Sequence, residues 1–446
     1  MTTVLDEVLP TLVTTAADVG ERSRSDAALG EISRRLLARS VAGAIAGGAD
    51  PAVSALTTIA GAGDHPLLTG GAPVATPAAA AGIHAAAVTV GQCDDGLREA
   101  AGHPGLHAFG AAWSVGLTVD AALGDVLAAF ATGWEAGARL GLLLGRPRTG
   151  IHPHGGWGTA AAAVATATIL GGDLQAQEAA ARAALSVALT GPDSTLVAGA
   201  STHYLLPALG TANGVTVGLL GLDLADTPVD AVSHFASVAH PRAAAAGGPD
   251  TPLLLQAYLK PLGLCAHTLT AWQVADDLRR EGGADRVVGT HVRTYRAAAA
   301  LAGSHGRTVL ARRFSVPWAV AYGLSGRRPG PDDGDLAALA ASVLIDHAPE
   351  LDDGYPRGRP TRVDFHFDDG RTVARQAVVH LGDRERPLSD RAEIDVCAAL
   401  LADGGRADLR AWLDELRRAP GDTPIRTLAS RVSGDRTTTP DLEGRR

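Results

Sequence analysis

The sequence predicts a mainly α protein, in which a smaller α+β segment interrupts a long helical part before helices resume. Alanine, leucine and valine dominate an apolar fraction of 46%, and aromatic residues make up only 4% of the chain. Alanine has the highest helix propensity and lets neighbouring helices pack closely. Apolar residues recur at helical spacing in the first half, and strand-like alternation begins only after Lys260. At 446 residues the chain is also too long for one hydrophobic core, unless that core is a very large helical one.

The first helical part is expected to span residues 1–258. Residues 29–49, LGEISRRLLARSVAGAIAGGA, place apolar side chains at helical spacing and stop at glycines. Residues 158–173 predict an alanine-rich helix that ends in a Gly-Gly pair, and another helix follows at 174–191. Residues 202–224, THYLLPALGTANGVTVGLLGLDL, predict a buried helix pair.

The α+β segment is expected at residues 259–388. Residues 286–296 alternate apolar and polar side chains as a half-buried strand does. Residues 361–381 contain two alternating runs joined by Asp-Asp-Gly, which is typical of a hairpin turn. Helices resume over 389–432, and the polar residues 433–446 predict a disordered tail.

Composition argues against several classes of function. A net charge of −9 with few aromatic residues argues against nucleic-acid binding, which needs basic patches and stacking surfaces. The chain shows no apolar run long enough for a membrane span and no signal-peptide pattern at its start. Cys93, Cys265 and Cys397 are far apart, which is typical of a reducing cytoplasm. We therefore expect a cytoplasmic protein whose partner is a small molecule.

Lys260 is the only lysine among 39 basic residues. Arginine stays charged, whereas a buried lysine can lose its proton and act as a base, an acid or a nucleophile. Lys260 also stands at the boundary between the two predicted parts, close to Cys265 and His267. The alternative is an exposed lysine without a function.

Residues 150–163, GIHPHGGWGTAAAA, place His152, His154 and Gly155 before the start of a helix. Free backbone N–H groups at a helix start suit a carboxylate or an oxyanion, and a histidine there can add a proton or a hydrogen bond. The alternative is a tight turn between helices. A His-x-His pair can also bind zinc, but no third ligand is evident nearby in the sequence, so we assign no metal.

Residues 91–114 carry Asp94, Asp95 and His103 around a His-Pro-Gly turn that leads into a helix, with His107 one turn further. His103 can act as a general acid or base that an aspartate orients. The alternative is that the aspartates cap a helix and His103 satisfies a loop carbonyl. His203 lies in an apolar stretch, where a lone histidine is more often a core residue than a catalyst.

These three segments together resemble the MmgE/PrpD family, which includes 2-methylcitrate dehydratases and cis-aconitate decarboxylases. The segments around residues 259–268, 311–324 and 381–394 are similar to its Lys-Pro…Cys…His, Ala-x-Phe-Ser and Gly-Asp…Pro-Leu-Ser segments, in the same order. The resemblance implies a large all-α helical domain built from both chain ends, with a smaller inserted α+β lid domain. It also implies a homodimer without a cofactor, with its active site between the domains.

Three catalytic residues follow from the resemblance. His103, His152 and Lys260 stand where the family has active-site histidines and its lysine, and Asp94 with Asp95 matches its aspartate pair. Lys260 and His103 would share the proton transfer, while His152 and the Gly-Gly turn that follows it would hold the developing oxyanion.

Six positions depart from the family pattern. Gln92 stands where the family has an aspartate before the pair, and Gly96 where it has a threonine after the pair. His203 stands where the family has a second lysine, and His154 where it has threonine. Cys265 falls on a position that can be histidine in the decarboxylases, and Trp318 on an active-site tyrosine. These losses predict a substrate less anionic than citrate. The residues expected to bind it are Asp94, Asp95, His154, Gly155, His203, Cys265, His267 and Trp318.

The expected function is a cofactor-independent lyase of a specialised pathway, which abstracts a proton from a small organic acid or carbonyl compound. Water or carbon dioxide would then leave. One alternative is an isomerase or cyclase that acts on a less anionic biosynthetic intermediate in the same pocket. A second alternative is a dimeric binding protein without catalytic activity.

Overall fold

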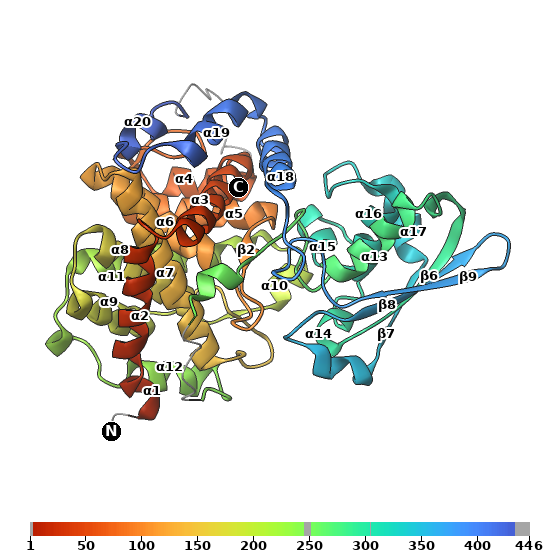
Figure 1. Ribbon diagram of the computed structural model, residues 1–446, viewed down its shortest axis with the longest axis horizontal. Helices are drawn as coiled ribbons and strands as arrows, with labels where there is room; N and C mark the ends of the chain where they lie inside the picture. Colours follow the sequence, from red (N-terminus) through yellow and green to blue (C-terminus); the bar gives the residue numbers. More distant parts are fainter. Residues whose placement is uncertain (1–2, 245–250, 304, 433–446) are drawn as a thin grey trace, which may run out of the picture. The chain divides into compact units, whose positions relative to one another are not determined.

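The computed structural model describes most of the chain and divides it into two compact units. The described residues are 3–244, 251–303 and 305–432 (Figure 1). The first unit draws on residues 1–192, 204–257 and 394–446, and the second on 193–203 and 258–393. The predicted disordered tail lies outside the described residues.

The first unit is an assembly of helices around α8 (Trp157–Ile169). Helix α8 packs against α6 (Pro104–Val119), α7 (Leu123–Leu144), α9 (Leu174–Ser186) and α11 (Leu205–Leu220). Helix α5 (Pro77–Gly91) packs against α6, α11 and α3 (Ala27–Gly47), while α2 (Leu9–Arg22) lies against α7. The shorter elements are α1 (Val4–Glu7), α4 (Pro51–Ile59), α12 (Ala231–Ala239), β1 (Ala62–His65), β2 (Asp95–Gly96), β3 (Ile151–His152) and β4 (Gly191–Pro192).

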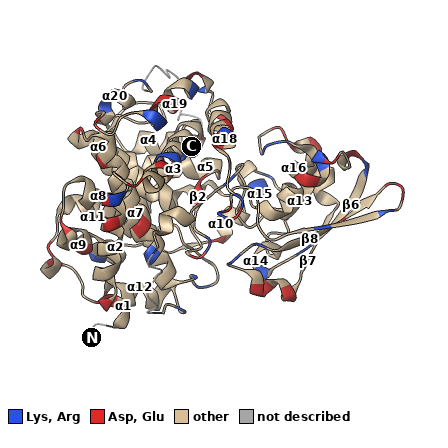
Figure 2. Ribbon diagram, viewed as in Figure 1, with Lys and Arg blue, Asp and Glu red and all other residues tan. Residues whose placement is uncertain are grey.

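The central helices of this unit are uncharged and approach one another closely. Helices α5, α6, α8 and α11 contain no Lys, Arg, Asp or Glu (Figure 2). A Cβ atom added to Gly133 in α7 would lie 2.7 Å from the backbone oxygen of Ala161 in α8. One added to Gly214 in α11 would overlap the backbone oxygen of Thr159, which also belongs to α8. These glycines therefore set the short separations between α8 and its neighbours.

The last part of the chain returns to the first unit from Ile394 onwards. Helix α18 (Asp390–Asp403) leads into α19 (Arg410–Arg418), which contacts α3, and α20 (Ile425–Ala429) contacts α6. Three backbone hydrogen bonds hold this segment. The N–H groups of Leu123 and Gly124 donate to the backbone oxygens of Thr423 and Gly421 over 2.9 and 2.7 Å, and the Ile425 N–H donates to that of Ala121 over 2.9 Å.

The second unit contains a four-stranded sheet in the order β7-β6-β8-β9. Its strands are β6 (Val287–Thr294), β7 (Val343–His347), β8 (Thr361–Phe367) and β9 (Thr372–Ala377). Strands β6 and β7 are parallel, and the other two pairings are antiparallel. The strand and the hairpin predicted from alternation are confirmed as β6 and as β8–β9, and Gly370 takes a positive φ of 83° in the turn.

Two helices of the second unit, α13 (Leu269–Arg280) and α16 (Val316–Ser325), pack against each other and contact the sheet. Trp318 and Tyr322 of α16 are buried in their shared core, together with Leu264 and Trp272. The remaining elements are α10 (Ser194–Val197), β5 (Tyr258–Leu259), α14 (Arg296–Ala299), α15 (Val309–Arg313) and α17 (Ala337–Ala341).

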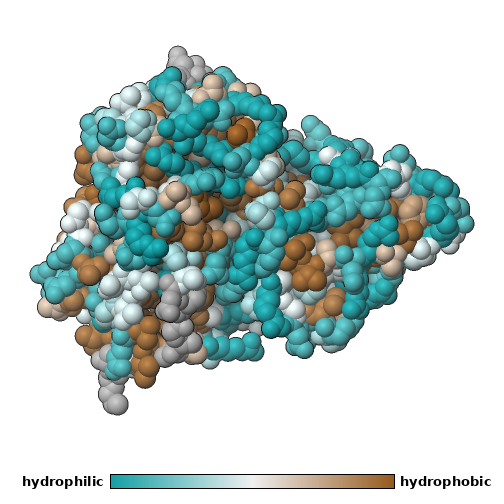
Figure 3. Space-filling model, viewed as in Figure 1, coloured by the Kyte–Doolittle hydropathy of each residue, from teal (hydrophilic) through white to brown (hydrophobic). Residues whose placement is uncertain are grey.

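The prediction of a mainly α protein is confirmed, because helices make up most of the described residues. The visible surface in Figure 3 intermixes hydrophilic and hydrophobic residues. No helix among the described residues combines the length and the apolar character that crossing a membrane requires.

Replacing Gly214 with alanine is expected to lower the free energy of unfolding by about 1–3 kcal/mol, because the added methyl group presses on the backbone of α8. The matched control is Gly43→Ala in α3, where an added Cβ would meet Val88 at an ordinary distance of 3.5 Å. This control is expected to be neutral or to stabilise by up to ~1 kcal/mol. Urea unfolding followed by circular dichroism measures both, and equal midpoints would contradict the expectation.

Candidate active site

Four histidines of the first unit lie together. His103 and His107 belong to the start of α6, His152 is the last residue of β3, and His154 lies in the turn between β3 and α8. The ring of His154 is at the centre, with its centroid 4.5 Å from that of His152, 5.5 Å from His107 and 5.6 Å from His103. The structure therefore brings together two sequence segments that were predicted separately to carry chemistry.

The His-Pro-Gly sequence explains how His103 is presented. His103 is the N-cap residue of α6, and Pro104 follows at the first helical position, where its missing N–H costs nothing. The His103 side chain does not cap the helix. Gly105 is required at the next position, because a Cβ there would overlap the carboxyl group of Asp95. The turn thus holds the imidazole of His103 beside the aspartate pair.

The turn before α8 depends on glycine for the same kind of reason. Gly155 has a φ of +85°, which residues with a side chain rarely adopt, and Gly156 is the N-cap of α8. A Cβ on Gly158 would overlap the His107 ring. The missing side chains let an imidazole lie directly on the first turn of α8.

His103 has its hydrogen fixed on Nδ1. This nitrogen lies 2.5 Å from the backbone oxygen of Asp95 and 3.3 Å from Oδ2 of Asp94. Both partners accept hydrogen bonds, so Nδ1 must donate. When His103 is neutral, its Nε2 therefore carries a lone pair and can accept a proton.

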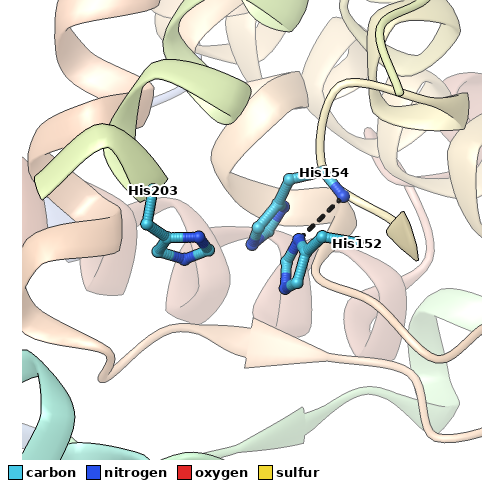
Figure 4. A group of neighbouring side chains, drawn as sticks. All are labelled: His152, His154 and His203. Atoms are coloured by element: carbon cyan, nitrogen blue, oxygen red, sulfur yellow. Dashed lines mark hydrogen bonds between the residues drawn. The ribbon is translucent and has the colours of Figure 1, made fainter. Parts of the chain in front are cut away.

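His152 has the opposite arrangement. The backbone N–H of His154 donates to Nδ1 of His152 over 3.2 Å (Figure 4). A backbone N–H can only donate, so Nδ1 of His152 is the acceptor and a neutral His152 carries its hydrogen on Nε2. One histidine of the cluster is thus prepared as a base and another as a hydrogen-bond donor.

The aspartate pair is split in charge. Burial, assisted by the neighbouring Asp94, raises the pKa of the Asp95 carboxyl from 3.8 to about 7, although the hydrogen bond from Trp134 lowers it. That bond joins Nε1 of Trp134 to Oδ2 of Asp95 over 2.7 Å. Asp95 therefore holds a proton at mildly acidic pH, which leaves Asp94 to interact electrostatically with His103.

The predicted residues of the second unit are all buried or half-buried. Lys260 is fully buried, which excludes the alternative of an exposed lysine. The backbone N–H of Cys265 donates to Arg313 over 2.8 Å, and Nδ1 of His267 lies 2.5 Å from the hydroxyl of Tyr295.

Trp318 and His203 also lie among aromatic or cationic groups of the second unit. The guanidinium of Arg312 is 5.1 Å from the centre of the Trp318 ring. The His203 ring is buried and lies edge-on to Phe314, with 6.1 Å between centroids. The His203 ring, drawn in Figure 4, thus has a core-like environment where it faces Phe314.

Three contributors to the cluster were not among the predicted site residues: His107, Trp134 and Thr211, whose hydroxyl lies 2.8 Å from Nδ1 of His107. His107 follows His103 by one helical turn, and this spacing could have indicated that both histidines lie on one face of α6. Trp134 and Thr211 come from α7 and α11, and the sequence carries no signal that relates them to the histidines.

A hollow of about 860 Å³ lies elsewhere on the first unit, beside β1 and α20. His65, Thr118 and Arg426 are among the residues that line it. None of its lining residues belongs to the histidine cluster. The chemistry of the cluster therefore does not depend on this hollow.

Asp95→Asn is expected to remove part of the pH dependence of stability. The unfolded chain releases the Asp95 proton near pH 3.8 and the folded protein only near pH 7, so the free energy of unfolding falls as pH rises through this window. The decline amounts to at most about 1.4 kcal/mol per pH unit. Urea unfolding between these pH values should show a flatter profile for Asp95→Asn, whereas exposed Asp226→Asn should follow the wild type; parallel profiles for all three proteins would refute the assignment.

Comparisons with known proteins identify the family of the chain. The model of the MmgE/PrpD N-terminal domain matches residues 12–247, and that of the MmgE/PrpD C-terminal domain matches residues 263–402. The search of curated proteins returned no match. Since the two family models follow each other in order and together extend over most of the sequence, the chain belongs to the MmgE/PrpD family.

Proposed function

We propose that the protein is a lyase that removes a proton next to a carbonyl or carboxylate group of a small organic acid, with loss of water or carbon dioxide. Membership of a family that includes dehydratases supports an enzyme of the lyase type. The observation that carries the proposal is the opposite placement of hydrogen on His103 and His152. Proton abstraction next to a carbonyl requires both a base and a donor to the oxygen that becomes negative.

His103 is the proposed base. Its Nε2 accepts the proton, and the imidazolium that forms is stabilised by Asp94 and by the backbone oxygen of Asp95, both of which face Nδ1. The same contacts fix the orientation of the ring. A base positioned in this way contributes on the order of 10² to 10⁴ to the rate.

His152 and the start of α8 are the proposed donors to the oxyanion. Helix α8 is uncharged and begins at Gly156 without a side-chain cap, so its first N–H groups and its dipole favour a negative charge nearby. His152 adds an N–H from Nε2. Neutral donors of this kind stabilise an enolate without binding a free carboxylate as strongly as lysine or arginine does.

Lys260 is the proposed proton donor, either to the hydroxyl group that leaves as water or to the carbon from which carbon dioxide leaves. Its burial supports this role, since the amine is shielded from bulk water and, unlike a guanidinium group, can transfer a proton. Cys265, His203 and Trp318 stand where the family has stronger donors, which supports a substrate less anionic than citrate. We further propose that the enzyme works as a homodimer without a cofactor. If the mass of the product equals that of the substrate, the isomerase or cyclase alternative replaces the lyase.

Deuterium exchange tests the proposed base even before a product has been identified. The protein is incubated in D₂O with a panel of 3-hydroxy acids, unsaturated acids and β-keto acids, and NMR and mass spectrometry follow loss of the α-proton, water and carbon dioxide. His103→Asn should slow exchange by about 10² to 10⁴. His234→Asn, at an exposed position of α12, should exchange at the wild-type rate. Exchange that survives His103→Asn would exclude His103 as the base.

Lys260→Arg should lower kcat by on the order of 10² for the substrate found in this way, because a guanidinium keeps its positive charge but does not transfer a proton. Lys260→Met, which also removes the positive charge, should be no more active than Lys260→Arg. Circular dichroism checks that both variants fold. Wild-type activity of a folded Lys260→Arg variant would show that the lysine serves only as a positive charge.

A further inference from the structure

A chain of hydrogen bonds runs from Thr211 to the centre of the histidine cluster. The hydroxyl of Thr211 in α11 lies 2.8 Å from Nδ1 of His107 in α6. Nε2 of His107 lies 3.4 Å from Nδ1 of His154. All three side chains are buried, and all three belong to the first unit.

The hydroxyl group of Thr211 has one hydrogen-bond acceptor among the described residues. Three neighbouring helical threonines, Thr159, Thr166 and Thr216, donate to the backbone oxygen four residues earlier. The hydroxyl of Thr211 has no such bond, and His107 is its only hydrogen-bond partner within the described part of the chain. A buried hydroxyl without an acceptor is costly, so Thr211 donates to Nδ1 of His107.

This donation fixes the hydrogens of both histidines. Burial lowers the pKa of His107 to about 3, so its imidazole is neutral and carries a single hydrogen. Because Nδ1 of His107 accepts from Thr211, that hydrogen is on Nε2 and is donated to Nδ1 of His154. A neutral His154 must then carry its own hydrogen on Nε2.

We propose that Thr211 and His107 are positioning residues that lock His154 in the Nε2–H form, so that His154 is a second hydrogen-bond donor of the site and not a second base. The catalytic part of this inference rests on the proposed function. His152 and His154 then present the same kind of N–H, and their rings are 4.5 Å apart between centroids. Two uncharged donors side by side suit one oxygen that gains negative charge during the reaction, such as that of an enolate.

The hydrogen bonds from Thr211 and His107 also explain why His154 can act only as a donor. An unconstrained neutral imidazole can hold its hydrogen on either nitrogen, so it would serve as base and donor in different molecules. With Thr211 and His107 in place, one form prevails before the substrate binds. The donor therefore needs no reorganisation when charge develops, which is what makes such groups effective.

The direct test is ¹⁵N NMR of the free protein with labelled histidine, in which long-range ¹H–¹⁵N correlations distinguish protonated from bare ring nitrogens. The signals of His154 are assigned by their loss in His154→Gln. The expected result is a bare Nδ1 and a protonated Nε2 on His154. A hydrogen on Nδ1 of His154 in the wild type would overturn the proposal. Because no substrate is present, this result stands or falls independently of the proposed lyase activity.

Thr211→Val and Thr211→Ser form the matched pair of variants. Valine has the shape of threonine but cannot donate, so the His154 signals should shift toward a mixture of the two forms and kcat should fall by up to about 10², with KM little changed. Serine keeps the hydroxyl and should restore both the wild-type signals and the rate. A Thr211→Val protein with wild-type His154 signals would show that Thr211 does not set the hydrogen positions.

Discussion

The close approach of uncharged helices to α8 is the constraint on which the candidate site depends. Glycine and alanine at these contacts let α11 and α6 lie against α8 with little space between the backbones. Gly214 holds α11 against α8, and Thr211 precedes it by one turn, which aims its hydroxyl at His107. Gly158 leaves the space that the His107 ring fills. A larger residue at either glycine would therefore change hydrogen positions as well as packing.

Within this environment, backbone groups and a neutral hydroxyl determine which ring nitrogen of each histidine carries the hydrogen. The directing partners are the Asp95 carbonyl for His103, the His154 N–H for His152 and the Thr211 hydroxyl for His107. Burial favours neutral forms of Asp95 and His107, so the charge of Asp94 stands out in its surroundings. The low local dielectric strengthens each remaining hydrogen bond.

The sequence was sufficient for the features that depend on local pattern. The Asp-Asp-Gly turn predicted the β8–β9 hairpin. The His-Pro-Gly turn placed His103 at the start of α6, and the Gly-Gly turn placed the start of α8 shortly after His152. It was insufficient where tertiary contacts decide. Residues 202–224 predicted a helix pair, but α11 is continuous there, because its glycines are packing positions against α5 and α8 and not a break. Trp134 and Thr211 are ordinary core residues by pattern, and only the fold relates them to the histidines.

The burial of Lys260 has a consequence for the chemistry of the protein surface. Because the chain has no other lysine, every positively charged side chain at the surface is an arginine or a protonated histidine. Guanidinium groups resist the acylation and carbamylation that attack lysine amines, and they keep their charge in alkaline solution. The surface charge of this protein is therefore insensitive to amine-modifying metabolites that would progressively neutralise a lysine-rich surface.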